Sequence, residues 1–198
     1  MLTLLPLWVL YLGVGFLLGP PATGRPDGWV LLLVLAVLVT PFQAAGEEYL
    51  FRGWLVQNIA VWFARPVLGF VVSTVVSSAL FALIHGSLDL WILLDLAVFA
   101  AVACYLNWRT GGLETGIALH LVNNVTLGIA TITIGGYTDS FVDTTTSGRP
   151  VDLAVTVVVQ TIALLLLLWQ GRRSQVQRHV SPGAALPALP AAAAPIRR

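Results

Sequence analysis

Long apolar runs recur along nearly the whole chain, and they constrain its fold more than any other feature. Each run approaches the roughly 20 residues that a helix needs to cross about 30 Å of hydrocarbon. The composition agrees, since 58% of the residues are hydrophobic and 10% are charged, against about 25% charged in an ordinary soluble domain. Most of this surface cannot face water, so the sequence predicts an integral membrane protein.

The runs are continuously apolar rather than alternating, which favours helices over the strands of a membrane barrel. Pro41 supplies no backbone N–H, so it is expected to break or kink the chain. The sequence leaves open whether the segments on its two sides are separate spans or one bent element. We predict an all-α, polytopic transmembrane bundle of six to seven helices, forming one domain over residues 1–170. The apolar segments lie at residues 2–19, 28–41, 44–63, 66–85, 88–106, 112–134 and 151–169.

Residues 171–198 differ from the rest of the chain in composition. They contain Arg residues and a Pro- and Ala-rich repeat with few large apolar side chains, so we expect a disordered tail. With seven spans, Arg149 lies on one side of the membrane, and the positive-inside rule makes the opposite, C-terminal side cytoplasmic. The arginines on that C-terminal side are then Arg25, Arg65, Arg109, Arg172, Arg173 and Arg178.

Charge and cysteine content exclude several function classes. All ten basic residues are Arg, mostly scattered singly, and the net charge is +1, so no basic face suits nucleic acid. The single Cys104 can form neither an internal disulfide nor a thiolate metal cluster.

The absence of Lys and the abundance of Ala, Val, Arg and Gly suit a GC-rich bacterial genome. The expected surroundings are therefore the lipid bilayer of a bacterial cell membrane.

Ionisable side chains within the apolar segments form the candidate site, because a charge in hydrocarbon needs a partner, a water-filled cavity or a function. On a helix, Glu48 and Arg52 are i, i+4 neighbours and can pair, whereas Glu47 is turned about 100° from Glu48. The pairing predicts that Arg52 orients Glu48 and that Glu47 is left free for chemistry. Taken alone, this string is equally typical of an interfacial salt bridge at a helix end.

Two further clusters lie in later segments. His85 follows Phe81 by four residues near the end of one segment, where a lone His is often a hydrogen-bonded interfacial residue. His120 and Asn124 share one helical face deep inside another segment, where a polar clamp between helices is the plainer interpretation. Together with the glutamates, these groups place a base, two imidazoles and an amide where almost nothing else ionises, which favours a reactive site.

The three clusters also resemble the motifs of a known family. The sequence is similar to the CAAX prenyl endopeptidase, abortive-infection and bacteriocin-processing (CPBP) family of intramembrane proteases over about residues 28–134. The resemblance implies peptidase activity in the membrane on a peptide or lipidated protein, although partner-binding or immunity roles are attributed to some relatives. The ordered motifs Glu-Glu-x-x-x-Arg, Phe-x-x-x-His and His-x-x-x-Asn appear here as Glu47, Glu48 and Arg52, as Phe81 and His85, and as His120 and Asn124.

Peptide hydrolysis needs an activated water, a stabilised oxyanion and a proton for the leaving amine. We expect Glu47 to act as general base with His85 helping to hold the water, and His120 and Asn124 to donate to the oxyanion. This mechanism requires no cofactor. It predicts that all four side chains converge on one polar cavity, even though His120 lies roughly 12 Å deeper in its helix than His85 does.

Three alternatives use the same residues differently. Glu47, His85 and His120 can be the ligands of Zn²⁺ or another divalent metal, since two His and one Glu form a known catalytic set. The same three groups can form the relay of a proton-coupled membrane carrier. A membrane immunity or scaffold protein would bind a peptide without cutting it. The sequence slightly favours the metal-independent protease, and it identifies no prenyl group on the substrate.

Overall fold

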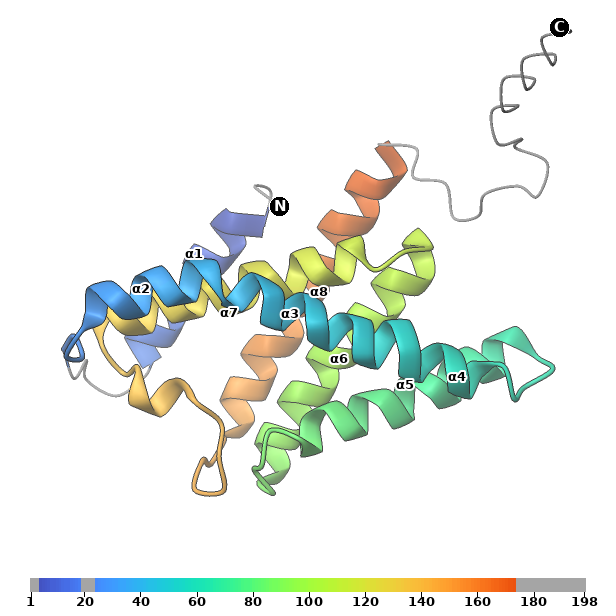
Figure 1. Ribbon diagram of the computed structural model, residues 1–198, viewed down its shortest axis with the longest axis horizontal. Helices are drawn as coiled ribbons and strands as arrows, with labels where there is room; N and C mark the ends of the chain where they lie inside the picture. The colour runs from blue at the N-terminus through green and yellow to red at the C-terminus, as the bar shows by residue number, and fades with distance from the viewer. Residues whose placement is uncertain (1–3, 19–23, 174–198) are drawn as a thin grey trace, which may run out of the picture.

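The computed structural model describes residues 4–18 and 24–173, in which helices are joined by turns and loops and no strand occurs (Figure 1). This arrangement confirms the all-α bundle. The α-helices are α1 (Leu5–Leu18), α2 (Trp29–Leu38), α3 (Thr40–Glu48), α4 (Val56–Ala60), α5 (Pro66–Leu83), α6 (Leu90–Thr110), α7 (Glu114–Ile134) and α8 (Pro150–Arg173). A π-helix, η2 (Tyr49–Leu55), and a 3₁₀ turn, η3 (Thr138–Ser140), complete the elements.

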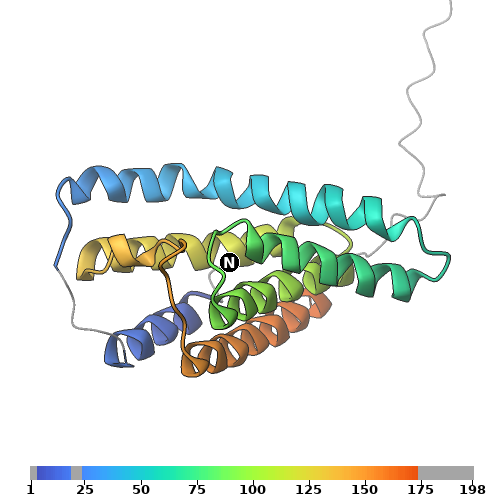
Figure 2. The same ribbon diagram turned by 90° about the horizontal axis from the view of Figure 1, so that it is seen from below.

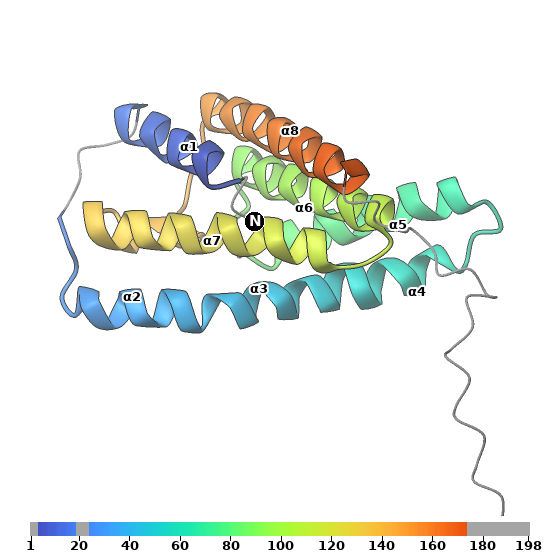
Figure 3. The same cartoon turned by 90° about the horizontal axis from the view of Figure 1, so that it is seen from above.

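The two segments around Pro41 form one bent element. The elements α2, α3, η2 and α4 follow one another as a single helical run, Trp29–Ala60, of 32 residues (Figure 3). Pro41 lies in the first turn of α3, where a missing N–H is tolerated. The backbone N–H of Gln43 donates to the Val39 carbonyl across Pro41 at 3.1 Å, so the helix continues. With α5, α6, α7 and α8, five helices in the described part of the chain are long and apolar enough to cross a membrane.

Helix α6 lies at the centre of the bundle, where it packs against α5, α7 and α8. The long run from α2 to α4 forms one face, and α8 with α1 forms the opposite face (Figures 2 and 3). Helix α7 packs against both α2 and α3. The core between these layers is aromatic and aliphatic, and it includes Trp8, Phe51, Phe81, Phe99, Leu106 and Leu119.

The outward faces of the helices are apolar as well. Helix α2 has no buried residue, and its exposed side chains include Val30, Leu31 and Leu38. A helix that is apolar around its whole circumference has lipid as its natural solvent. The structure therefore supports an integral membrane protein.

Merging two predicted segments changes the side of the membrane assigned to one arginine. Arg25 now precedes a single span and falls on the side of Arg149, so its predicted placement with Arg65 was wrong. The contact between Arg25 Nε and the Thr133 carbonyl, 3.1 Å apart at the end of α7, agrees with the new placement. Helix α8 ends at Arg173, on the side of Arg65. A cytoplasmic C-terminus stays a prediction. Residues 171–173 of the expected disordered tail are the last residues of α8, so that boundary was wrong, and the rest of the tail lies outside the described residues.

The connection between α5 and α6 is anchored by Asp89. Its carboxylate caps α6 by accepting hydrogen bonds from the backbone N–H groups of Trp91, at 2.9 Å, and Ile92, at 3.2 Å. It also accepts from Gly148 in the loop before α8, at 3.2 Å. The N–H groups of Ile92, Gly148 and Trp91 hold the pKa of Asp89 below its usual value. This cap fixes the start of the helix that lies at the centre of the bundle.

Asp89→Ala is expected to lower the melting temperature in detergent at pH 7, because α6 loses its cap and the loop loses an anchor. Because the pKa of Asp89 is lower in the folded protein, its stabilisation is present above about pH 4 and is lost as the pH falls further. The difference between wild type and Asp89→Ala should therefore shrink in acid. Asp89→Asn, which keeps an N-cap acceptor, is the matched control. A pH-independent difference would contradict the electrostatic part of this account.

Candidate active site

The helix that carries Glu47 and Glu48 changes from α to π immediately after them. The π-helical turns of η2 span Tyr49–Leu55, and such widened turns are often found at functional sites. Within this stretch Arg52 lies beside Glu48, with Arg52 Nη1 and Glu48 Oε1 separated by 3.0 Å and both side chains buried. Arg52 therefore pairs with Glu48 and leaves Glu47 to other partners, which is the division that the spacing predicts.

Glu48 is the most heavily satisfied acidic group of the site, and its side chain is 0% exposed. Besides Arg52, the Nδ1–H of His120 donates to Glu48 Oε1 at 3.1 Å, and the amide of Asn107 donates to Oε2 at 3.3 Å. The amide oxygen of Asn107 in turn accepts from the backbone N–H of Gly116 at 2.8 Å. Glu48 thus links the long helix to α6 and α7 through three buried contacts.

Arg52 has a second kind of partner. Its guanidinium carbon lies 4.6 Å from the centre of the Phe81 ring, a cation–π geometry that is stronger when it is desolvated. The Phe81 ring is also 5.3 Å from Phe51 and 4.9 Å from His85, centre to centre. The Phe of the Phe-x-x-x-His motif therefore packs the ion pair against α5.

Glu47 occupies a more open position than Glu48. Its side chain is 23% exposed, and its Oε1 accepts a hydrogen bond from the side-chain amide of Gln43 one turn earlier. Its Oε2 lies 3.7 Å from His120 Nε2 and has no hydrogen-bond partner among the described residues. That separation is too long for a direct hydrogen bond and is suited to a bridging water. Glu47 is thus the carboxylate with a free acceptor.

His120 lies between the carboxylates of Glu47 and Glu48. A carboxylate accepts hydrogen bonds, so the contact with Glu48 places a proton on Nδ1 and turns Nε2 toward Glu47. Asn124 reaches the same place indirectly, because its amide donates to Gln43 Oε1 at 3.4 Å. Gln43 therefore connects Asn124 to Glu47.

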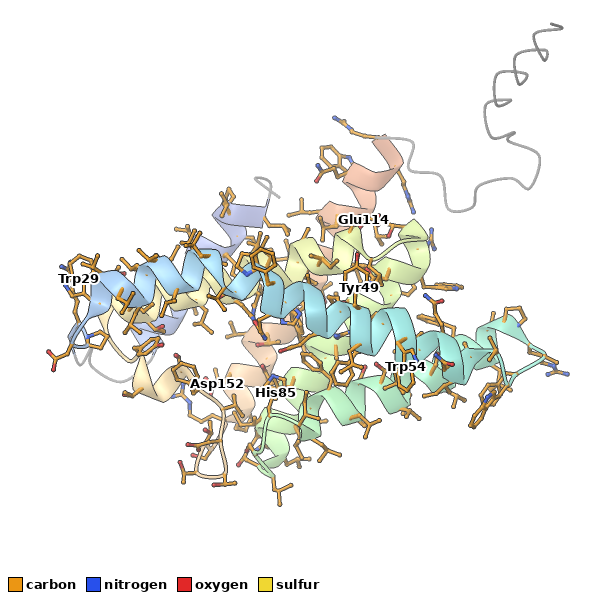
Figure 4. The ribbon with its side chains drawn as sticks, in the orientation of Figure 1. Trp29, Tyr49, Trp54, His85, Glu114 and Asp152 are labelled. Carbon is orange, nitrogen blue, oxygen red and sulfur yellow. The ribbon has the colours of Figure 1, made fainter. Side chains whose placement is uncertain are left out.

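His85 follows the end of α5, in the connection to α6 that Figure 4 shows. Its Nδ1–H donates to the carbonyl of Phe81 at 2.7 Å, which leaves Nε2 available. His85, His120 and Asn124 line one cavity of about 610 Å³. Glu47 is not among the residues that line this cavity, and it is joined to them through Gln43 and His120. The structure thus brings the four predicted side chains to one region, with Glu47 at its edge.

The geometry of the site has one of the two features expected of a metal site and lacks the other. In both His85 and His120 the Nδ1–H is held by an oxygen, as is usual behind a metal-ligating imidazole. However, no three His, Cys, Asp or Glu side chains in the described part of the chain are arranged to hold a metal ion. Because this arrangement does not fit Zn²⁺ or another divalent ion held by Glu47, His85 and His120, we derive no step through a metal.

Sequence reasoning missed several polar residues that the structure places at the site or in its cavity. Asp95, which lines the cavity, lies on α6 inside the predicted apolar segment 88–106, and Asn107, which supports Glu48, follows directly after that segment. Gln43 lies one helical turn before Glu47, so its position on the same face was readable from the spacing. Each is a polar residue within an apolar run or directly beside one, which is the signal that could have identified it.

Comparison with known proteins adds a family to this geometry. The family model described as type II CAAX prenyl endopeptidase Rce1-like matches residues 26–126, which are 101 of the 198 residues. The chain belongs to this family. The match confirms the resemblance seen in the motifs, and the matched segment contains all six candidate residues from Glu47 to Asn124. The Rce1-like segment thus coincides with the helices that build the site.

One curated relative extends the comparison beyond the Rce1-like segment. The chain is 26% identical to an uncharacterized protein of Bacillus subtilis strain 168, YyaK, over 164 residues. The alignment covers 77% of this chain and 53% of YyaK, so the chain spans about half the length of that relative. No solved structure matches the chain.

Proposed function

We propose that this protein is an intramembrane endopeptidase that hydrolyses a peptide bond of a membrane-associated peptide or protein, with Glu47 as the general base. One observation carries the proposal: Glu47 Oε2 has no hydrogen-bond partner among the described residues and faces His120 Nε2 across 3.7 Å. A water between these two atoms would be held for deprotonation. Membership of the Rce1-like family supports the same reaction class.

The proposed reaction uses the division of labour between the two glutamates. Glu47 Oε2 takes a proton from the water, whose oxygen forms a bond to the peptide carbonyl carbon. The carbonyl electrons move to oxygen, and this oxyanion accepts a hydrogen bond from the Asn124 amide. Glu47 then returns its proton to the leaving amine as the C–N bond breaks. Glu48 takes no proton in this scheme, since three partners already hold it.

His120 acts as a positioned imidazole in this proposal. The hydrogen bond from Nδ1–H to Glu48 fixes its tautomer and orientation, as a buried carboxylate does for the histidine of a serine-protease triad. Its Nε2 is thereby aimed at the water site in every turnover. His85, whose Nε2 is also available in the cavity, is the second imidazole able to accept a hydrogen bond from the water.

The test is cleavage by the purified protein in detergent. The protein is incubated with a peptide library, and new peptide termini are identified by mass spectrometry. Glu47→Gln should yield none of the wild-type termini, whereas Glu114→Gln, which changes an exposed glutamate at the start of α7, should yield all of them. A proton-coupled carrier or a non-cleaving immunity protein would produce no new termini at all, and that result would overturn the proposal.

Metal removal is expected to leave cleavage unchanged, to within about twofold, because no step of the proposed mechanism passes through a metal. The measurement is the cleavage rate after dialysis against 1,10-phenanthroline or EDTA, with and without added Zn²⁺. Buffer dialysis without chelator controls for loss of folded protein. Loss of activity that added Zn²⁺ restores would show that the imidazoles and Glu47 rearrange to bind metal, contrary to the proposal.

A further inference from the structure

A second polar group lies on the wall of the same cavity. Asp95 of α6 and Thr156 and Gln160 of α8 all line it, together with His120. Thr156 and Gln160 are i, i+4 neighbours, so they share one helical face. Helices α6 and α8 pack against each other along the bundle, on the side away from the long helix (Figure 3). None of these three residues belongs to the motifs of the candidate active site.

These three side chains offer hydrogen-bond acceptors that no described residue uses. Thr156 is the one polar side chain among the described residues that acts favourably on the Asp95 carboxylate. Gln160 is 4% exposed, and its Oε1 has no hydrogen-bond partner in the described part of the chain. A buried acceptor left without a donor is costly, so its presence in a cavity indicates a ligand with N–H groups.

Asp95 also lacks a cationic partner among the described residues. No Arg lies within ion-pair distance of it among residues 4–18 and 24–173, and no Arg lines the cavity. The other carboxylate that acts on it, Asp152, repels it and is itself paired with Arg149 at 2.7 Å. A carboxylate between membrane-spanning helices needs a cation or a function. A simple clamp between α6 and α8 would have satisfied both Asp95 and Gln160.

We propose that Asp95, Thr156 and Gln160 form a subsite that binds a cationic side chain, Lys or Arg, of the peptide substrate and so sets cleavage specificity. An ammonium or guanidinium group supplies the positive charge that Asp95 lacks and the N–H donors that Gln160 Oε1 lacks. This inference rests on the proposed function, since it names the substrate class of that same cavity.

The position of the subsite fits a residue close to the cleaved bond. Phe99 lies four residues after Asp95 on α6, and its ring is 5.0 Å from the His120 ring, centre to centre. Four residues of helix rise about 6 Å, while an extended peptide advances about 3.4 Å per residue. A long cationic side chain one to three residues from the scissile bond would therefore reach Asp95 while the bond lies at His120.

The experiment compares matched peptides. A cleaved library peptide is resynthesised with Arg or norleucine at each of the three positions on either side of the cut. Wild type should prefer Arg at one position by about tenfold or more in kcat/KM, as expected for a hydrogen-bonded charge pair. Asp95→Asn should lose that preference by slowing the Arg peptide and leaving the norleucine peptide within about twofold. Asp27→Asn, an exposed carboxylate outside the cavity, is the control and should keep the preference.

Binding separates this inference from the proposed protease function. Fluorescent forms of both peptides are titrated into Glu47→Gln and into Glu47→Gln with Asp95→Asn, so that affinity is read without cleavage. The subsite is supported if the Arg peptide binds more tightly than the norleucine peptide and this difference disappears with Asp95→Asn. This holds even if the wild-type protein cleaves no peptide. Equal effects of Asp95→Asn on both peptides, or no wild-type preference, would overturn it. Gln160→Leu, which removes the free acceptor and leaves Asp95 in place, should weaken binding of the Arg peptide and leave binding of the norleucine peptide unchanged. It replaces Asp95→Asn in the test if that variant does not fold.

Discussion

Glu47→Gln is expected to slow peptide cleavage by about 100-fold to 10,000-fold, the usual effect of removing a general base. The change is nearly isosteric, and the new side chain can still accept the hydrogen bond that Gln43 donates to Glu47 Oε1. What it loses is the ability of Oε2 to take a proton from water. Because Glu47 makes no ion pair with Arg52, the fold should be unaffected, and the melting temperature in detergent should stay at the wild-type value.

A second glutamate variant makes this prediction specific to Glu47. Glu114→Gln again controls for the general effect of removing a glutamate. A Glu47→Gln protein that cleaves at near the wild-type rate would contradict the mechanism. If that protein were also unstable, Glu47 would be the glutamate that stabilises the fold.

The local parts of the site could be predicted from the sequence because helices repeat on a fixed period. The pairing of Glu48 with Arg52, four residues apart, follows from helix geometry alone. So does the placement of Asn124 on the face of His120, although the structure routes its contact through Gln43. The helical bundle itself followed from the length of the apolar runs, since a backbone in lipid must satisfy its own hydrogen bonds.

The parts of the site that join distant helices could not be predicted in this way. His120 and Glu48 are 72 residues apart, and Asn107 and Glu48 are 59 apart, so no periodicity relates them. The role of Pro41 was ambiguous for a different reason, because a proline ends a helix in its interior and is tolerated in its first turn. The Asp95 group was overlooked because a single carboxylate in an apolar run forms no motif.

The same distant contacts change what is expected of Glu48. The sequence predicted that Glu48 pairs with Arg52 and is oriented by it. In the structure it also fixes the Nδ1–H of His120, and thereby the direction of Nε2 at the proposed water site. Glu48 is therefore a positioning residue as well as a partner in an ion pair, and its two roles should respond differently to a second substitution.

Glu48→Gln should lower the free energy of unfolding by about 3 to 5 kcal/mol, because it leaves Arg52 charged and unpaired in a buried site. Arg52→Met should also destabilise, since it leaves Glu48 with one charge partner fewer. The double variant should recover part of the loss, because no unpaired buried charge remains between these two positions. The rate of peptide cleavage should not recover in the double variant, because His120 lacks the Glu48 carboxylate there too.

The experiment is a double-mutant cycle of thermal or denaturant unfolding in detergent, with kcat/KM measured on the same four proteins. Recovery of stability without recovery of activity in Glu48→Gln, Arg52→Met would separate the ion pair from the positioning of His120. If activity returned with stability, Glu48 would act through folding alone, and the orientation of His120 would need another cause. If Glu48→Gln were instead stable and inactive while Glu47→Gln were active, the base would be Glu48, and its three contacts would have to loosen before it could take a proton.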